Sequence, residues 1–412
     1  MKKTICIIGG GPAGMMAAIS SKTANPDNEI HLLEKNPLLG RKLRATGGNR
    51  CNVTNNCSRE ELVAQIPGNG RFLYSVFDQF SNQDIIQFFE SHGCPLKEED
   101  HGRMFPTTDR SQTIIETLKK TIDDLGVHTH LETTVHQIDW KNKRIVGDKQ
   151  VFPFDTLILT TGGVCAQHTG STGDGLKFAK TLGHTITELF PTEVPLVASE
   201  NFIHDGSLQG ISLSDISLTL WSDKHKKVKT IRYDLVFTHF GISGPAPLRL
   251  SSFVRKQLIK QQAPVLVTID CIPDISLDTI MANRKDFNEK QPATWIKQYV
   301  PSRLAALLVS LADLSADQKV GQLSPAQLDR LLQLLKAFPL TIRGTQGMER
   351  AFVTGGGISI KEVQPKTMES KLVPELYFAG EVLDIYGFTG GFNITAALAT
   401  GYVAGLHSNK KA

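Results

Sequence analysis

The chain has 412 residues, more than one hydrophobic core usually accommodates, so we expect two or three domains. The formal net charge is only +4 and the lysines are scattered, which argues against a nucleic-acid partner; the run from His225 to Lys229 is interpreted as a solvated strand or turn. No apolar run approaches the ~20 residues that a membrane-spanning helix needs. Residues 4–8 are too short for the apolar core of a signal peptide. We therefore expect a cytoplasmic protein that binds neither nucleic acid nor membrane.

The six cysteines form no CxxC pair and no regular pattern. The sequence therefore predicts neither a zinc site nor a disulfide framework, and no other metal site is expected. Cys51 and Cys57 lie close together in a polar segment, which leaves a redox dithiol as a disfavoured alternative.

The N-terminal segment has the pattern of a Rossmann βαβ unit. The apolar run Thr4–Ile8 suits a buried parallel strand, Gly9–Gly14 satisfies GxGxxG, and Ile30–Leu33 suits a second strand. The three glycines would allow a tight turn, close approach of a pyrophosphate, and helix–sheet contact. Glu34 follows the second strand, where a carboxylate can accept hydrogen bonds from ribose hydroxyls. The predicted dinucleotide contacts here are Gly9, Gly11, Pro12, Ala13, Gly14, Glu34 and Lys35.

Three later segments favour FAD over NAD. Phe154–Gly163 and Leu376–Glu381 are apolar strands that end in glycine, and both resemble the strands through which flavoproteins with two dinucleotide-binding domains return to their cofactor. Thr389–Asn393 opens a small-residue helix running to about Gly405, whose positive N-terminus would stabilise an anionic reduced flavin; an ordinary core helix is the alternative. No attachment motif is evident, so we expect non-covalent FAD. The predicted contacts are Thr161, Gly162, Gly163, Gly380, Glu381, Gly391, Phe392 and Asn393.

The loop Gly40–Asn55 resembles the signature of a family of bacterial NAD(P)/FAD-dependent oxidoreductases, also described as aminoacetone-oxidase-like FAD-binding enzymes. A bile-acid dienoyl reductase belongs to the same family. The resemblance continues, in order, through His101–Pro106, Thr169–Gly175, Phe237–Pro245 and Phe378–Asp384, and so covers nearly the whole chain. It implies that the loop lines the cofactor.

Two departures from the family pattern are expected to be tolerated. Asn49 replaces a third glycine, and asparagine accepts left-handed geometry better than most residues; Asp174 stands in the later glycine-rich stretch. Within the loop, Arg41 and Lys42 can offset pyrophosphate charge, although a solvated basic loop is the alternative. The cofactor contacts assigned to this loop and to the segment after it are Arg41, Lys42, Thr46, Gly47, Gly48, Asn52 and Val135.

The predicted fold is α/β, with a Rossmann-type FAD domain built from residues 1–190 and 350–412. Strand-like patterns at 193–196, 213–229 and 265–269 predict an inserted β-barrel-like domain over residues 191–275 and 338–349, and leucines at helical spacing predict a helical subdomain over 276–337. Gly355–Gly357 lacks the rest of a GxGxxG unit, so no second nucleotide domain is expected. NAD(P)H would then act as a transient donor in the substrate cleft.

The resemblance implies an FAD-dependent oxidoreductase of small molecules, with three hypotheses for the reaction. The preferred one is oxidation of a small amine or ketone resembling aminoacetone, with reoxidation by oxygen. The second is NAD(P)H-dependent reduction of a conjugated C=C bond, and the third is a non-catalytic flavin-binding or RNA-modification partner. Arg50, His239 and Tyr386 are weak candidates for catalytic residues. The sequence indicates no oligomeric state.

Overall fold

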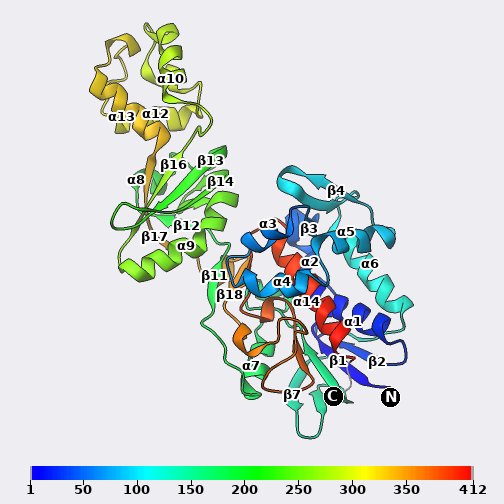
Figure 1. Ribbon diagram of the computed structural model, residues 1–412. Coiled ribbons are helices and arrows are strands. Elements are labelled where there is room, and N and C mark those ends of the chain that lie inside the picture. Colours follow the sequence, from blue (N-terminus) through cyan, green and yellow to red (C-terminus); the bar gives the residue numbers. More distant parts are fainter. Residues whose placement is uncertain (1, 410–412) are drawn as a thin grey trace. The chain divides into compact units, whose positions relative to one another are not determined.

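The computed structural model describes residues 2–409 (Figure 1). The chain divides into two compact units: a split unit, Met1–Pro191 with Phe352–Ala412, and a middle unit, Thr192–Ala351. No helix among the described residues is long and apolar enough to cross a membrane.

The centre of the split unit is a five-stranded parallel sheet in the order β19-β10-β1-β2-β6. β1 is the middle strand and β10 is one of its two neighbours. The apolar side chains of both strands are almost entirely buried, as expected for a parallel sheet covered on both faces. The strands span Leu376–Phe378 (β19), Thr156–Leu159 (β10), Thr4–Ile8 (β1), Glu29–Leu33 (β2) and His128–His130 (β6). The predicted βαβ unit and both returning strands are therefore confirmed.

Three longer helices pack in the split unit: α1 (Pro12–Ala24), α6 (Ser111–Asp124) and α14 (Phe392–His407). α1 and α14 lie side by side (Figure 1). A Cβ atom added to Gly401 or Gly405 would lie 2.3 or 2.2 Å from a carbonyl oxygen of α1, so the two backbones touch directly.

Smaller elements complete the split unit. The smaller sheets are the antiparallel β3-β5-β4 and β7-β8-β9 and the two-stranded β11-β18. Their strands are Thr54–Asn55 (β3), Leu96–Glu99 (β4), Arg103–Pro106 (β5), Val135–Asp139 (β7), Arg144–Gly147 (β8), Val151–Pro153 (β9), Phe190–Thr192 (β11) and Val353–Gly355 (β18). The shorter helices are Arg41–Arg44 (α2), Arg59–Ala64 (α3), Tyr74–Phe77 (α4), Asn82–Ser91 (α5) and Asp174–Thr181 (α7).

The middle unit contains a closed barrel in the order β12-β15-β14-β13-β16-β17, which agrees with the expected β-barrel-like insertion. The strands are Leu196–Ala198 (β12), Ser212–Trp221 (β13), Lys227–Thr238 (β14), Gly241–Ser243 (β15), Val265–Asp270 (β16) and Phe338–Thr345 (β17). The helices are Asn201–His204 (α8), Pro245–Gln261 (α9), Leu277–Asn283 (α10), Pro292–Ile296 (α11), Ser302–Leu311 (α12) and Pro325–Lys336 (α13).

Two details of the middle unit differ from the sequence prediction. The strand predicted at 193–196 starts only at Leu196, because Glu193 has φ +52 and Pro195 lacks an N–H for a ladder. The long helix α9 lies in a segment predicted to be β-rich. Its buried positions include Ser251 and Gln257, which interrupt the apolar stripe that would have indicated a helix.

Candidate functional site

The turn between β1 and α1 contains three glycines in different surroundings. A Cβ atom at Gly9 would lie 2.6 Å from the Thr160 carbonyl oxygen, and one at Gly14 would lie 1.9 Å from the Gly9 oxygen. A Cβ atom at Gly11 would meet nothing within 4 Å, and Gly11 is the N-cap of α1 without any side-chain cap. The second glycine therefore borders open space at a helix N-terminus, which is suited to an anion.

Polar residues gather where β2 ends. The Glu34 carboxylate accepts hydrogen bonds from the Gly10 N–H at 2.7 Å and from the Asn36 N–H at 2.8 Å. Arg41 Nη1 donates to Asn36 Oδ1 at 2.7 Å, and Lys35 Nζ forms a 2.7 Å ion pair with an Asp174 carboxylate oxygen. Glu34, Lys35 and Arg41 are thus brought to one sheet edge, next to the glycine turn.

Glu381 connects three predicted cofactor segments. One carboxylate oxygen pairs with Lys42 Nζ at 2.6 Å and the other accepts the Thr354 N–H at 2.8 Å. A Cβ atom at Gly163 would lie 3.3 Å from the Glu381 carboxyl carbon. Thr354 also binds the main chain after Gly163, since its hydroxyl accepts the Val164 N–H at 2.9 Å. Sequence reasoning missed Thr354 because it lies far away in the chain, in the short strand β18.

The signature loop is joined to the start of α14. With its side-chain amide in the orientation that satisfies its partners, Asn52 accepts the Gly391 N–H at 3.1 Å and donates to the Thr54 oxygen at 2.9 Å. Asn55 Nδ2 donates to the Gly390 oxygen at 3.2 Å, and the Thr54 hydroxyl lies 2.7 Å from that of Thr395. Thr54 and Asn55 were not predicted as site residues. The Thr-Asn pair at the end of the signature loop could have indicated them.

Helices α1 and α14 run parallel, because Gly401 lies over Ala13 and Gly405 lies over Ala17. Both N-termini therefore point the same way. α14 begins nine residues before Gly401 and so extends about 14 Å beyond that contact. Each N-terminus carries a partial positive charge. The split unit thus offers two electropositive helix ends that point in the same direction.

Asn393, expected at the flavin, has a bracing role in the structure. Its Oδ1 accepts the Gly387 N–H at 2.7 Å, and its Nδ2 donates to the Gly387 and Phe388 oxygens at 2.8 and 3.1 Å. The side chain therefore folds back on the preceding turn. No side chain caps α14, whose N-cap is Gly391.

The signature loop contains three adjacent residues in left-handed backbone geometry. Gly47, Gly48 and Asn49 all have positive φ, so the asparagine does adopt the left-handed geometry of the glycine that it replaces. The Thr46 hydroxyl donates to the Leu43 oxygen at 2.7 Å. Burial raises the pKa of Cys51 to about 12, so its thiol remains protonated near neutral pH. Val135 begins β7 and is half-buried.

The three catalytic candidates lie in unlike surroundings. Arg50 pairs with Glu99 at 2.8 Å and with Asp109 at 3.3 Å, so its charge is engaged. Tyr386 is buried within the split unit, with its ring edge against Phe190 (centroids 5.4 Å apart). His239 is exposed between β14 and β15 of the middle unit. Arg50 and Tyr386 thus belong to the split unit, and His239 belongs to the middle unit.

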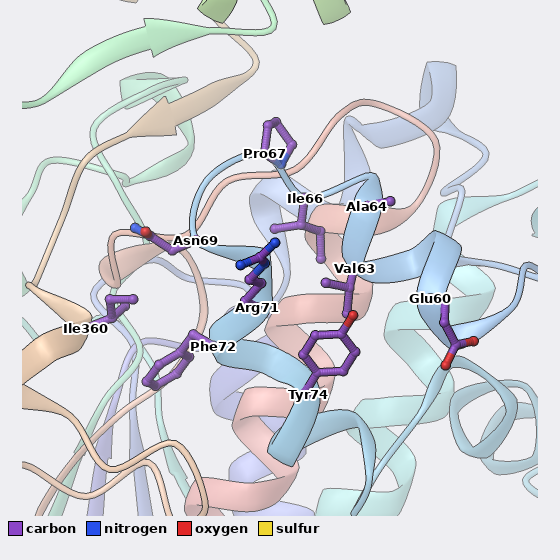
Figure 2. A pocket seen from close by; sticks show the side chains of 11 residues that line it. Glu60, Val63, Ala64, Ile66, Pro67, Asn69, Arg71, Phe72, Tyr74 and Ile360 are labelled. Carbon is purple, nitrogen blue, oxygen red and sulfur yellow. The ribbon is translucent and has the colours of Figure 1, made fainter.

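A separate pocket of about 560 Å³ lies beside α3 and α4 (Figure 2). Its lining contains no residue of the predicted cofactor site. The adjoining loop is tied to the Tyr386 turn, because the Gly68 N–H donates to the Tyr386 oxygen at 2.9 Å and Asn69 Nδ2 donates to the Asp384 oxygen at 2.7 Å.

The residues of the split unit fit an FAD molecule. Positions 11 and 48 border open space, two helix ends supply positive charge, and the Thr161 hydroxyl is buried without a partner among the described residues. Such an orphaned hydroxyl is normally satisfied by a bound group or water. Among these residues, no group of three or more His, Cys, Asp or Glu side chains could hold a metal ion.

Comparisons with known proteins identify the family of the chain. Residues 3–407 match the family described as HI0933-like protein Rossmann domain. The 3-dehydro-bile acid delta(4,6)-reductase of Clostridium scindens is 30% identical over 410 residues, 97% of this chain and 98% of that protein. A ribosomal RNA dihydrouridine synthase of Haemophilus influenzae is 28% identical over 417 residues, 98% of each chain.

The fold is similar to that of a 3-ketosteroid delta1-dehydrogenase from Sterolibacterium denitrificans, with a TM-score of 0.53 and 12% identity over 99% of both chains. The family resemblance that the motifs indicated is confirmed, but the aminoacetone-oxidase-like description is not directly shown. The chain belongs to the HI0933-like family of Rossmann-domain proteins and is an FAD-dependent oxidoreductase.

Proposed function

We propose that this protein is a reductase that adds a hydride and a proton to a carbon–carbon double bond conjugated to a carbonyl group. The observation that carries the proposal is the shared chemistry of two relatives that match nearly the whole chain. One name denotes reduction of a delta(4,6) bile acid that is oxidised at position 3, and the other denotes conversion of uridine to dihydrouridine. In both, the reduced double bond adjoins a carbonyl, which makes its far carbon electrophilic.

The proposed cofactor is non-covalently bound FAD, which would supply the hydride. Gly11 and the α1 N-terminus would hold the pyrophosphate, and Glu34 would accept the ribose hydroxyls. The α14 N-terminus, held by Asn52 and Asn55, would face the flavin ring and favour its reduced, negatively charged form.

Tyr386 is the proton donor that we favour among the three candidates. Its neighbour Gly387 is bound to the Asn393 amide at the start of α14, whereas the Arg50 charge is engaged by two carboxylates. The sequence analysis preferred oxidation of a small amine or ketone. In that reaction electrons would pass from the substrate to the flavin, opposite to the direction proposed here. No observation at the site favours that direction.

The test is an anaerobic half-reaction study. The purified protein is reduced with NADH or NADPH and then mixed with a 3-oxo-4,6-diene steroid, with a uridine-containing RNA, or with aerated buffer. We expect faster reoxidation by one of the two unsaturated compounds than by oxygen, and a product that has gained two hydrogens. Reduction of the flavin by aminoacetone, with reoxidation by oxygen alone, would overturn the proposal. Acid should release intact FAD.

A further inference from the structure

One end of the six-stranded barrel has surface chemistry that the cofactor site does not use. β13 and β14 form an antiparallel hairpin that turns at residues 222–226. α9 follows β14 closely, because the Arg249 guanidinium stacks on Tyr233 at 3.9 Å and Lys229 Nζ lies 5.4 Å from the Phe253 ring centroid. The step from Arg249 to Phe253 along the helix therefore corresponds to the step from Tyr233 back to Lys229 along the strand. Helix and strand are antiparallel.

The last turns of α9 therefore lead toward the hairpin turn. From Phe253 to Gln261 the helix advances by about 12 Å. The chain then returns almost at once in β16, where Val267 pairs with Leu220 near the end of β13. Both observations place the end of α9 beside the hairpin. The lysines of these two segments, which we call the basic end, are Lys224, Lys226, Lys227, Lys229, Lys256 and Lys260.

The charge of the basic end is scarcely compensated. Its six lysines make no ion pair within residues 2–409, and all are exposed except the half-buried Lys229. The hairpin turn contains one acid, Asp223, whose carboxylate accepts its neighbour's backbone N–H at 3.0 Å. Val228 and Ile259 add exposed apolar surface, with 41% and 51% accessibility. So many like charges in one place repel one another unless an anionic partner neutralises them.

We propose that the basic end docks the phosphate backbone of a structured RNA. Lysine ammonium groups bind phosphates without reading sequence, and such contacts fix the position of a nucleic acid. Two scattered apolar side chains do not make the continuous apolar face by which an amphipathic helix enters a membrane. RNA is also the substrate named for two relatives that match 98% and 96% of this chain. The choice of RNA as the partner is the only part of this inference that rests on the proposed function.

The test compares RNA binding by full-length variants. The probe is a fluorescein-labelled RNA stem–loop of about 20 base pairs, a length that spans the grooves a double-stranded RNA site contacts. Binding is measured by anisotropy over a range of salt concentrations, without NAD(P)H. In K226Q/K227Q/K256Q we expect at least about tenfold weaker binding and a log–log salt slope smaller by about 2–3. The matching arginine triple should retain binding.

A charge-matched control, K285Q/K290Q/K297Q, changes three exposed lysines of the helical subdomain and should bind like the wild type. Equal weakening in both triples would mean that net charge alone matters, and unchanged binding in the first triple would also overturn the proposal. So would binding to vesicles with 30% phosphatidylserine but not to the RNA. Flavin content and circular dichroism report folding of each variant. Because no turnover is measured, failure here is separate from failure of the reductase proposal.

Discussion

At Gly11 the main chain passes open space at the start of α1, and a side chain there would meet no protein atom within 4 Å. Gly344, in β17 of the middle unit, has the same freedom. Neither position requires glycine for the fold itself. We therefore predict that any need for glycine at position 11 comes from the bound dinucleotide.

The substitution Gly11→Asp should abolish FAD binding while leaving the protein folded, because the new carboxylate would stand against the pyrophosphate. We expect flavin content at least about tenfold below that of the wild type, which corresponds to about 1.4 kcal/mol or more of lost binding. Visible absorbance of the purified protein measures it. Gly344→Asp is the matched control and should remain yellow; a yellow Gly11→Asp protein would contradict the assignment.

Single residues also show where sequence reasoning was incomplete. The pattern at 389–393 correctly predicted the start of a helix, and Asn393 was assigned to the cofactor. Its amide makes three hydrogen bonds to Gly387 and Phe388, which the sequence pattern did not indicate. A side-chain amide can bind either a ligand or the main chain, and composition does not distinguish the two. Geometry does.

At the scale of elements, the contact between α1 and α14 depends on small residues. A Cβ atom at Gly405 would lie 2.2 Å from the Ala17 carbonyl oxygen, which is backbone and cannot rotate away. Gly405→Ala should lower the free energy of unfolding by about 1–3 kcal/mol, although alanine normally favours a helix by about 1 kcal/mol over glycine. Denaturant titration measures this. Gly344→Ala, in open space, should change little; an equally stable Gly405→Ala protein would mean that the helices separate easily.

A stack of histidines joins β2 to β6. His31 Nδ1 lies 3.0 Å from His130 Nε2, and the ring centroids of His31 and His128 are 5.2 Å apart; Glu29 faces the other His31 nitrogen at 3.2 Å. Burial lowers the pKa of both His31 and His130 below the ordinary value of 6.5. The folded protein therefore resists protonation of these rings more than the unfolded chain does.

The free energy of unfolding should accordingly fall as pH drops below about 6.5, because the unfolded state binds more protons there. The decrease should be seen between about pH 7 and pH 5, where the histidines of the unfolded chain take up protons. In His31→Gln the pH dependence should be shallower, and urea titrations at several pH values measure it. His204→Gln, at an exposed histidine, is the control. The same slope in wild type and His31→Gln would exclude the stack as its source.

The lysine run at 225–229 illustrates how element packing changes an interpretation. Alone, it resembles an ordinary solvated turn. α9 adds Lys256 and Lys260 beside it, and this helix was not predicted. The expectation of no nucleic-acid partner was therefore made without a third of the lysines that form the basic end.

At the scale of the molecule, the chain leaves and re-enters the split unit through the paired strands β11 and β18. The two ends of the middle unit are thus neighbours, and a short Gly-Ser linker can replace residues 193–351. Since the predicted FAD contacts all lie in the split unit, the shortened protein should retain FAD. It should lose substrate turnover, because we expect the middle unit to supply part of the substrate pocket. Flavin content and steady-state rates measure the two properties. Full turnover without the middle unit would refute that role.

The sequence by itself determined the βαβ unit, the returning strands and the insertion between them, because buried parallel strands and glycine turns leave strong local patterns. It also identified the family from motifs that span the chain. Only the tertiary structure decided that Thr354 binds beside Gly163 and that Glu381 pairs with Lys42. These partners lie 190 and 339 residues apart, and a hydrogen bond or ion pair between them imposes no local periodicity on the sequence. Such contacts arise when separate segments meet at the ends of one sheet.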